Sequence, residues 1–295
     1  MGGPGELMNE EALSFGSTAS LVGIVSNHKN HPADCARPGF IMLNSGVVHR
    51  VGPNRLSVNI LRDMAALGYV GFRFDFSGIG DSMARSGAPA TGGDLNSVER
   101  RWIAETQEAM DCVTANSGVE RFILGGNCSG AYIALRTAMC DPRVTAVALI
   151  NLQPKRTPVR YYLRSLVYKK FWRRIFQGTA RIEWPSGIYL QYLANFRARL
   201  AGTKGEEGLR IPDLGNALHA LSERGVNVLL VHCEWDRGYD YFKNIIRSKR
   251  RAAGVGTRLS VQFIPGMNHD FNILRGQEDL QRIIRNWAAG LEESE

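Results

Sequence analysis

Five consecutive residues, Gly126–Gly130, carry the clearest chemical signal in the sequence, because they place Cys128 at the centre of a Gly-x-Cys-x-Gly motif. The related Gly-x-Ser-x-Gly motif forms a sharp strand-to-helix turn that projects its strained central residue above a sheet as a nucleophile. Residues 121–124 are predicted to form the preceding strand and residues 131–138 the following helix. The motif therefore predicts a cysteine nucleophile, although a buried thiol without a chemical role is the competing interpretation.

A cysteine nucleophile needs a base to accept its proton and a carboxylate to orient that base. Two apolar segments, 227–232 and 258–263, are predicted strands, and they are followed by Asp236 and His269. Because the carboxyl ends of parallel strands meet at one edge of a sheet, these two side chains are expected to lie near Cys128. The sequence thus predicts a Cys-His-Asp triad.

Three other residues compete for the role of the acid. Glu234 and Asp240 occupy the same loop as Asp236, and Asn151 follows an earlier strand at a position from which some enzymes take the acid. Asp236 remains the preferred candidate. Ser129 is a weaker nucleophile than Cys128, because shifting the motif by one residue would require glycines at positions that hold asparagine and alanine.

The elements that must position these residues alternate between strands and helices. Strands are predicted over 20–27, 39–44, 69–75, 121–124, 144–150, 227–232 and 258–263, and helices over 56–67, 95–116, 131–138, 213–224, 240–253 and 276–291. This alternation is typical of a parallel α/β sheet with right-handed crossovers. Residues 151–210 have helical stretches but no clear strand, so they are predicted to be an insertion between core parts 1–150 and 211–295.

Composition narrows the class of protein. The chain has 295 residues, 44% hydrophobic and 22% charged, as in an ordinary globular protein, and no apolar run approaches the roughly 20 residues of a membrane-spanning helix. No signal peptide is visible, so a cytoplasmic location is expected. The five cysteines include no Cys-x-x-Cys pair, and no nearby histidines have the spacing of a zinc site. We therefore expect no disulfide, no metal and no cofactor.

From Phe40 onward the chain resembles an α/β-hydrolase. Three motifs in the same order carry this resemblance, at residues 44–55, 73–82 and 126–131, and they are similar to those of hydrolases associated with bacterial exosortase gene clusters and of serine-aminopeptidase-like hydrolases. The cysteine in the third motif also resembles dienelactone hydrolases and polyhydroxyalkanoate synthases, which share a Cys-His-Asp arrangement. The compact dienelactone enzymes lack a basic insertion, and the polymer synthases are longer.

The resemblance implies a mostly parallel central sheet flanked by helices, with residues 151–210 as a helical cap. It also implies that His269 is the base, Asp236 the orienting acid, and the backbone N–H groups of Val47 and Ser129 the oxyanion hole. His49 and Arg50 follow the oxyanion loop and are candidates either for substrate contact or for a structural role; the two interpretations stay level.

The inserted segment holds 13 Lys and Arg against 3 Asp and Glu, a net charge of +10, whereas the whole chain has +8. Within this segment, aromatic and basic residues alternate over residues 155–174, a stretch that ends in Arg173 and Arg174. Such a segment can bind nucleic acid or an anionic membrane, or be simply a solvated helical face. An acidic acyl carrier protein or the phosphates of coenzyme A fit the predicted chemistry better, and nucleic acid is not the expected partner.

A thiolate exchanges readily with a thioester, and the enzyme thioester stays activated for transfer. The leading hypothesis is therefore a thioesterase or acyltransferase acting on an acyl thioester. A carboxylesterase or lactone hydrolase acting on a small ester is the first alternative, and a non-catalytic binding protein with the same fold is the second.

Overall fold

The computed structural model describes residues 8–28, 37–85, 95–152, 214–236, 238–239, 242 and 258–292. The chain divides into two compact units, residues 1–154 together with 211–295, and residues 155–210. The fold and the site described below belong to the first unit. All of the predicted helix 240–253 except Phe242, and nearly all of the predicted cap, 151–210, lie outside the described residues. Among the helices that are described, none is both long and apolar enough to cross a membrane.

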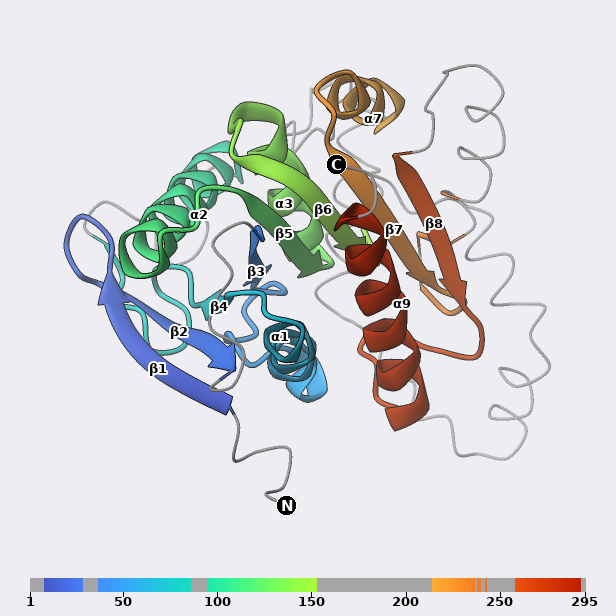
Figure 1. The fold of residues 1–295 in the computed structure, drawn as a ribbon, viewed down its shortest axis with the longest axis horizontal. Helices are drawn as coiled ribbons and strands as arrows, with labels where there is room; N and C mark the ends of the chain where they lie inside the picture. The colour runs from blue at the N-terminus through green and yellow to red at the C-terminus, as the bar shows by residue number, and fades with distance from the viewer. Residues whose placement is uncertain are drawn as a thin grey trace, which may run out of the picture. The chain divides into compact units, whose positions relative to one another are not determined.

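A single mixed sheet forms the centre of the first unit (Figure 1). Its eight described strands run in the order β1-β2-β4-β3-β5-β6-β7-β8. These are β1 (Met8–Phe15), β2 (Leu21–His28), β3 (Gly39–Leu43), β4 (Gly71–Phe74), β5 (Phe122–Asn127), β6 (Val144–Ile150), β7 (Asn227–Cys233) and β8 (Leu259–Ile264). The pairs from β4 to β8 are parallel, whereas β2 is antiparallel to both β1 and β4.

Helices cover both faces of this sheet. The helices are α1 (Leu56–Ala66), preceded by the short 3-10 turn η1 (Pro53–Arg55), α2 (Leu95–Ser117), α3 (Ser129–Cys140), α7 (Leu214–Glu223) and α9 (Leu274–Glu292). The contacts place α1 beside α9 on one face and α3 beside α2 and α7 on the other. The expected α/β architecture, a mostly parallel sheet between two helical layers, is confirmed.

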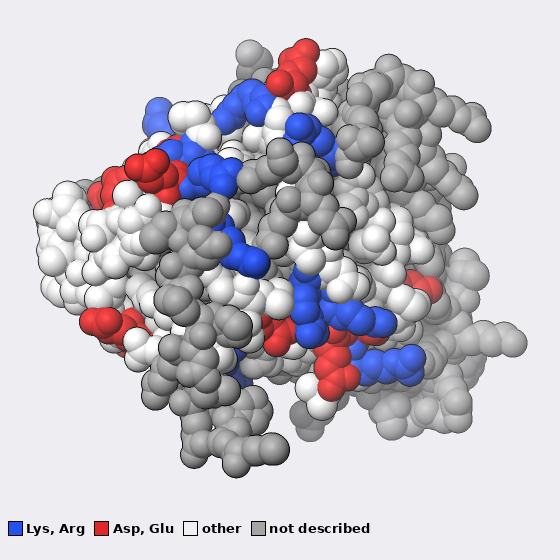
Figure 2. Space-filling view, in the orientation of Figure 1, with Lys and Arg blue, Asp and Glu red and all other residues white. Residues whose placement is uncertain are grey.

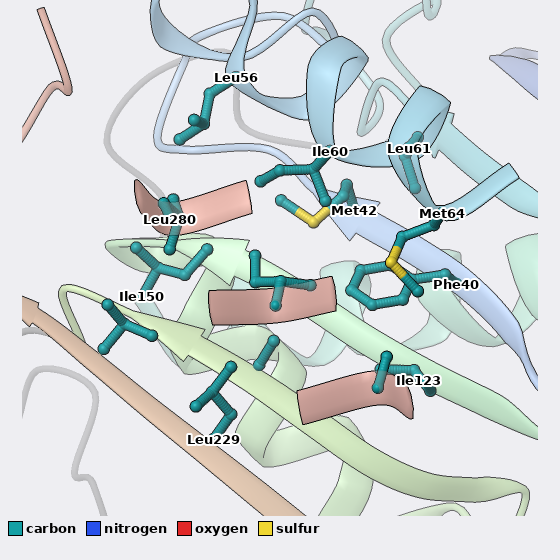
Figure 3. Close-up of a cluster of buried hydrophobic side chains, with 14 of the residues drawn as sticks. Phe40, Met42, Leu56, Ile60, Leu61, Met64, Ile123, Ile150, Leu229 and Leu280 are labelled. Atoms are coloured by element: carbon teal, nitrogen blue, oxygen red, sulfur yellow. The ribbon is translucent and has the colours of Figure 1, made fainter. Parts of the chain in front are cut away.

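The alternation of side chains along the strands explains the two layers. Phe40 and Met42 of β3 pack with Ile60 and Met64 of α1 in one buried cluster, as Figure 3 shows. Ile123 of β5 belongs to the same cluster. Alternate residues of β6 and β7 join the same cluster, and on the other face of the sheet α3 contacts β6 and α7 contacts β7. Because β5, β6 and β7 are buried on both sides, their sequences are continuously apolar rather than alternating.

Strand β1 was absent from the sequence-based prediction. Most of its side chains are exposed or half-buried because it is an edge strand, so the apolar pattern that marks a strand is missing. Its Glu10 instead accepts hydrogen bonds from Arg62 of α1 and Arg73 of β4. The hydrogen bond from Arg62 outweighs the opposing effect of burial and, with the charge of Arg73, lowers the pKa of Glu10 to about 2. An ionic contact thus attaches this edge to the core.

Candidate functional site

The Gly126–Gly130 motif forms a tight turn between β5 and α3. Cys128 lies between the last residue of the strand and the first residue of the helix, and its backbone has a positive φ, with φ 58° and ψ −114°. This conformation is costly for a residue with a side chain and is found where the surrounding structure enforces it. The Cys128 N–H donates to the carbonyl of Ile150 at 3.0 Å, and its carbonyl accepts from Tyr132 at 3.2 Å. The strained residue is therefore held from both β6 and α3.

The two glycines of the motif are explained by close backbone contacts. A Cβ atom at Gly126 would lie 2.3 Å from the carbonyl carbon of Gly130, and one at Gly130 would lie 2.6 Å from the carbonyl oxygen of Asn44. Neither distance is compatible with a side chain. The first contact closes the turn onto its own helix, and the second brings the loop after β3 against the beginning of α3.

Asp236 and His269 meet at the carboxyl ends of β7 and β8. The Nδ1 atom of His269 lies 2.6 Å from Oδ2 of Asp236, whose side chain is 1% exposed. The other carboxylate oxygen accepts the N–H of Gly238 at 2.7 Å. Burial opposes ionisation of Asp236, but the nearby His232 ring, the contact with His269 and the hydrogen bond from the Gly238 N–H overcome it and hold the pKa of this carboxyl far below its usual range. Asp236 is thus an ionised partner for the histidine.

His269 also faces Cys128. Burial by itself would lower the pKa of His269, but hydrogen bonds and charge interactions with Asp236 and Cys128 raise it to about 10. An imidazolium is therefore favoured between an ionised carboxylate and the cysteine sulfur. Cys128 lies directly before Ser129, at the N-terminus of α3, where the helix dipole is positive. A cysteine acts as a nucleophile in its thiolate form.

A second histidine lies behind the acid. The His232 ring is fully buried and stacks on Phe242 with ring centroids 4.2 Å apart. Its Nδ1 is 3.7 Å from Oδ1 of Asp236, which is longer than a normal hydrogen bond. Burial lowers the pKa of His232, so it is neutral beside the ionised acid. His232 could not be identified from the sequence, because it lies inside an apolar strand where a histidine gives no pattern of its own.

The predicted oxyanion residues lie on two segments that touch. The N–H of Gly46 donates to the Ser129 hydroxyl at 2.6 Å, so the loop after β3 is tied to the first turn of α3. The side chain of Ser129 thus has a backbone partner, as expected for a neighbour of the nucleophile rather than the nucleophile itself. As the first residue of α3, Ser129 has an N–H that the helix leaves without an internal acceptor. Val47, the other predicted donor, is 87% exposed.

Arg50 is held by carboxylates at one end of the oxyanion loop. Its guanidinium forms ion pairs with the fully buried Asp75 and, at 2.6 Å, with Asp81, and its N–H donates to Asp75 at 2.5 Å. Asp75 also accepts the side-chain amide of Asn44, the residue after β3. These contacts favour the structural interpretation of Arg50. His49 is exposed, and its ring accepts the Val51 N–H at 3.4 Å.

The competing acids occupy other positions. Glu234 accepts the N–H of Gly266 at 2.9 Å in an exposed turn, and Asp240 lies outside the described residues. Asn151 is fully buried, and its amide contacts the carbonyl of His269 rather than the imidazole. Asp236 is therefore the acid that the geometry pairs with His269.

The predicted partner-binding residues, Arg173 and Arg174, lie outside the described part of the chain. On the face drawn in Figure 2, basic side chains are interspersed with acidic ones. Among the described residues, Arg143 pairs with Asp111 at 2.5 Å and with Asp141 at 2.9 Å. Within the described ranges, no group of histidine, cysteine and acidic side chains is arranged to hold a metal ion, and Cys112, Cys128, Cys140 and Cys233 are free thiols.

No protein-family model and no curated protein sequence matches the chain. Solved structures do. A proline iminopeptidase from Mycobacterium smegmatis superposes with a TM-score of 0.57 at 17% identity, over 96% of this chain and 98% of its own. The fold is that of the α/β-hydrolases.

Two further solved structures with this fold are named for ester-cleaving enzymes rather than for a peptidase. A dienelactone hydrolase from Anabaena variabilis has a TM-score of 0.54 at 13% identity, over 95% of this chain and 97% of its own. A structure from a study of the carboxylesterases of the thaumarchaeon Nitrososphaera gargenis has the same TM-score and identity, over 97% of this chain and 100% of its own. At these identities the likeness establishes the fold, and the chemistry must be argued from the site.

Proposed function

We propose that the protein is an acyl-transferring or acyl-hydrolysing enzyme with Cys128 as nucleophile, His269 as general base and acid, and Asp236 as the orienting carboxylate. The observation that carries the proposal is the placement of all three at one edge of the sheet. Cys128, which has a positive φ at the N-terminus of α3, interacts with His269, and Nδ1 of His269 lies 2.6 Å from the buried, ionised Asp236. The α/β-hydrolase fold and the hydrolase names of its structural neighbours agree with this class of chemistry.

In the first step the Cys128 thiolate attacks the acyl carbonyl carbon. The oxyanion that forms is bound by the N–H groups of Ser129 and Val47. When the tetrahedral intermediate collapses, the bond to the leaving thiolate or alkoxide breaks, and the His269 imidazolium gives its Nε2 proton to that group. The products of this half-reaction are an acyl-Cys128 thioester and a free thiol or alcohol.

The second step regenerates the thiol. Neutral His269 accepts a proton from water, an alcohol or an amine as its oxygen or nitrogen attacks the thioester carbonyl. The C–S bond then breaks, and Cys128 leaves as a thiolate beside the newly formed imidazolium. Throughout both steps Asp236 stays ionised and fixes the tautomer and orientation of the ring.

The preferred substrate class is an acyl thioester. Exchange between a thiolate and a thioester replaces one C–S bond with another of similar energy, so the acyl group remains activated. We further propose that the carrier is anionic, either coenzyme A or an acidic acyl carrier protein, because the segment 151–210, which contains Arg173 and Arg174, has a net charge of +10.

Intact-protein mass spectrometry tests this proposal. The full chain is mixed with acyl-CoA and, separately, with acyl carrier protein thioesters, and quenched in acid. A mass increase equal to one acyl group is expected for wild type and for Asp236→Asn at a slower rate, and not for Cys128→Ala. Ser129→Ala is the matched control, and it should still be acylated. Absence of an adduct with every donor would refute the proposal.

A second candidate function is hydrolysis of small esters or lactones. The names of two structural neighbours, a dienelactone hydrolase and the carboxylesterases, favour it. The same triad would act, with an alkoxide as the leaving group. Comparison of kcat/KM for an acyl-CoA and for the ethyl ester of the same acid separates the two candidates. A higher value for the ester, unaffected by replacing Arg173 and Arg174 with glutamate, would favour the second.

A further inference from the structure

Asn151 is the first residue after β6. It lies among the segments that carry Cys128, Asp236 and His269. Its N–H donates to the carbonyl of Val231 in β7 at 2.8 Å. The preceding carbonyl, that of Ile150, accepts the Cys128 N–H at 3.0 Å. One dipeptide therefore connects the nucleophile to the strand that ends next to Asp236.

The side chain of Asn151 also connects these segments. Its Oδ1 accepts the N–H of Cys233 at 2.9 Å, and its Nδ2 donates to the carbonyl of His269 at 3.2 Å. The same amide approaches Asn127 Oδ1 at 3.3 Å, and Asn127 in turn directs its own amide toward the His269 carbonyl at 3.5 Å. Two buried amides from neighbouring strand ends thus converge on the backbone of the base.

The backbone of Asn151 has a positive φ. Its φ is 46°, in the left-handed region that asparagine tolerates better than other residues with a side chain, and it is fully buried. A strained, buried residue is retained where its contacts compensate for the strain. Here those contacts fix the position of His269 relative to β5, β6 and β7.

We infer that Asn151 is a positioning residue for the catalytic base: its amide holds the backbone of His269 so that the ring spans Cys128 and Asp236. The inference rests on the proposed function of the triad. Asn151 acts through His269 and does not contact the reacting atoms. Because a displacement of about 1 Å of a catalytic group can cost about 100-fold in rate, loss of this amide should lower kcat rather than raise KM.

Two variants test the inference. Asn151→Asp keeps the shape of the side chain and the acceptor for Cys233 but replaces the amide donor with a carboxyl. Asn151→Gly suits the left-handed backbone and removes both side-chain contacts. The matched control is Asn54→Gly: Asn54 is also left-handed, with φ 51°, and donates its amide at 2.9 Å to the carbonyl of Asp270, next to His269, but it is exposed.

Two readouts are taken at 25 °C on samples shown by circular dichroism to be folded. The first is turnover of an activated acyl donor, for which both Asn151 variants should lose about 10- to 100-fold in kcat with KM within about twofold of wild type. The second is the rate at which iodoacetamide alkylates Cys128 between pH 6 and 9. This rate should be slower in the variants at pH 7 and should rise more steeply with pH. The control should match wild type in both.

Wild-type kcat and an unchanged alkylation profile in Asn151→Asp would overturn the inference, even if its melting temperature fell. An equal loss in Asn54→Gly would also overturn it, because loss of any hydrogen bond to the loop that carries His269 would then have the same effect. The alkylation measurement needs no substrate. If wild type formed no acyl adduct, the proposed function would fail, while the alkylation profiles would still report on the positioning of His269.

Discussion

The two sides of the candidate site are built in different ways. The nucleophile side, made of β3, β5 and α3, is held by close backbone contacts around Gly126 and Gly130 and by the ion pairs of Arg50 with Asp75 and Asp81. The acid and base side, made of the ends of β6, β7 and β8, is held by buried side-chain hydrogen bonds centred on Asn151 and Asp236.

This difference predicts different consequences of substitution. Changes on the nucleophile side should mainly affect folding, because they introduce steric clashes or leave a buried charge without its partner. Changes on the acid and base side should mainly affect the rate of reaction, because they leave the packing intact and move or discharge His269. Four variants, ordered from the largest expected effect to the smallest, test this contrast.

Arg50→Met should lower the free energy of unfolding by about 3 kcal/mol, because it leaves the buried carboxylate of Asp75 without its cation. Urea titration followed by circular dichroism measures the loss. Arg282→Met is the matched control, since Arg282 pairs with Asp279 on the surface and should cost less than about 1 kcal/mol. A stable Arg50→Met protein with a raised KM would instead assign Arg50 to substrate binding.

Gly130→Ala should cost about 2–3 kcal/mol, because the added methyl group would lie 2.6 Å from the carbonyl oxygen of Asn44. Gly290→Ala is the control. A Cβ at Gly290 in α9 meets no atom within 4 Å, so alanine should stabilise that helix by about 0.5–1 kcal/mol. Equal melting temperatures for the two variants would show that the turn has more room than its contacts indicate.

His269→Gln should lower stability by about 1–2 kcal/mol near pH 6, with a difference from wild type that shrinks toward pH 10. The pKa of His269 is raised from 6.5 to about 10, so its contribution is complete below 6.5 and is lost as pH rises through 10. The depressed pKa of Asp236 keeps its own contribution present above 3.8. Unfolding measured from pH 5 to 10 checks this, and a difference that grows with pH would contradict it.

His232→Phe should change stability by less than about 1 kcal/mol, since phenylalanine can keep the stacking on Phe242 and removes buried ring nitrogens that have no hydrogen bond of normal length. Its kcat should fall by about 3- to 10-fold, because Asp236 loses a polar neighbour. The measurement is kcat against pH for an activated ester. Full activity would show that Asp236 is held by Gly238 and His269 alone.

The same contrast explains what could be predicted from the sequence. The proposed nucleophile lies in five consecutive residues whose spacing itself specifies the turn, so Cys128 could be singled out together with its flanking strand and helix. Asp236 and His269 could be proposed from the order of the strands, because each follows a predicted strand by only a few residues. The alternation of strands and helices was likewise enough for the fold class.

The supports of the acid and base could not be found in this way. Asn151 and His232 matter because of what they contact across the sheet, and neither forms a local pattern with its sequence neighbours. Arg50 had two level interpretations, and only its distances to Asp75 and Asp81 favour the structural one. Strand β1 was missed for a related reason, since its pairing with β2 and the contacts of Glu10 attach it to the sheet, while most of its side chains are exposed or half-buried.

We propose that Cys128 is the residue that carries the acyl group. The most direct test is to acylate the full chain with an activated thioester, quench it in acid, digest it with trypsin and locate the added mass by fragmentation of the peptide that contains Cys128 and Ser129. We expect one acyl group on Cys128, formed more slowly in His269→Gln. An acyl group on Ser129, or none on this peptide in wild type, would contradict it.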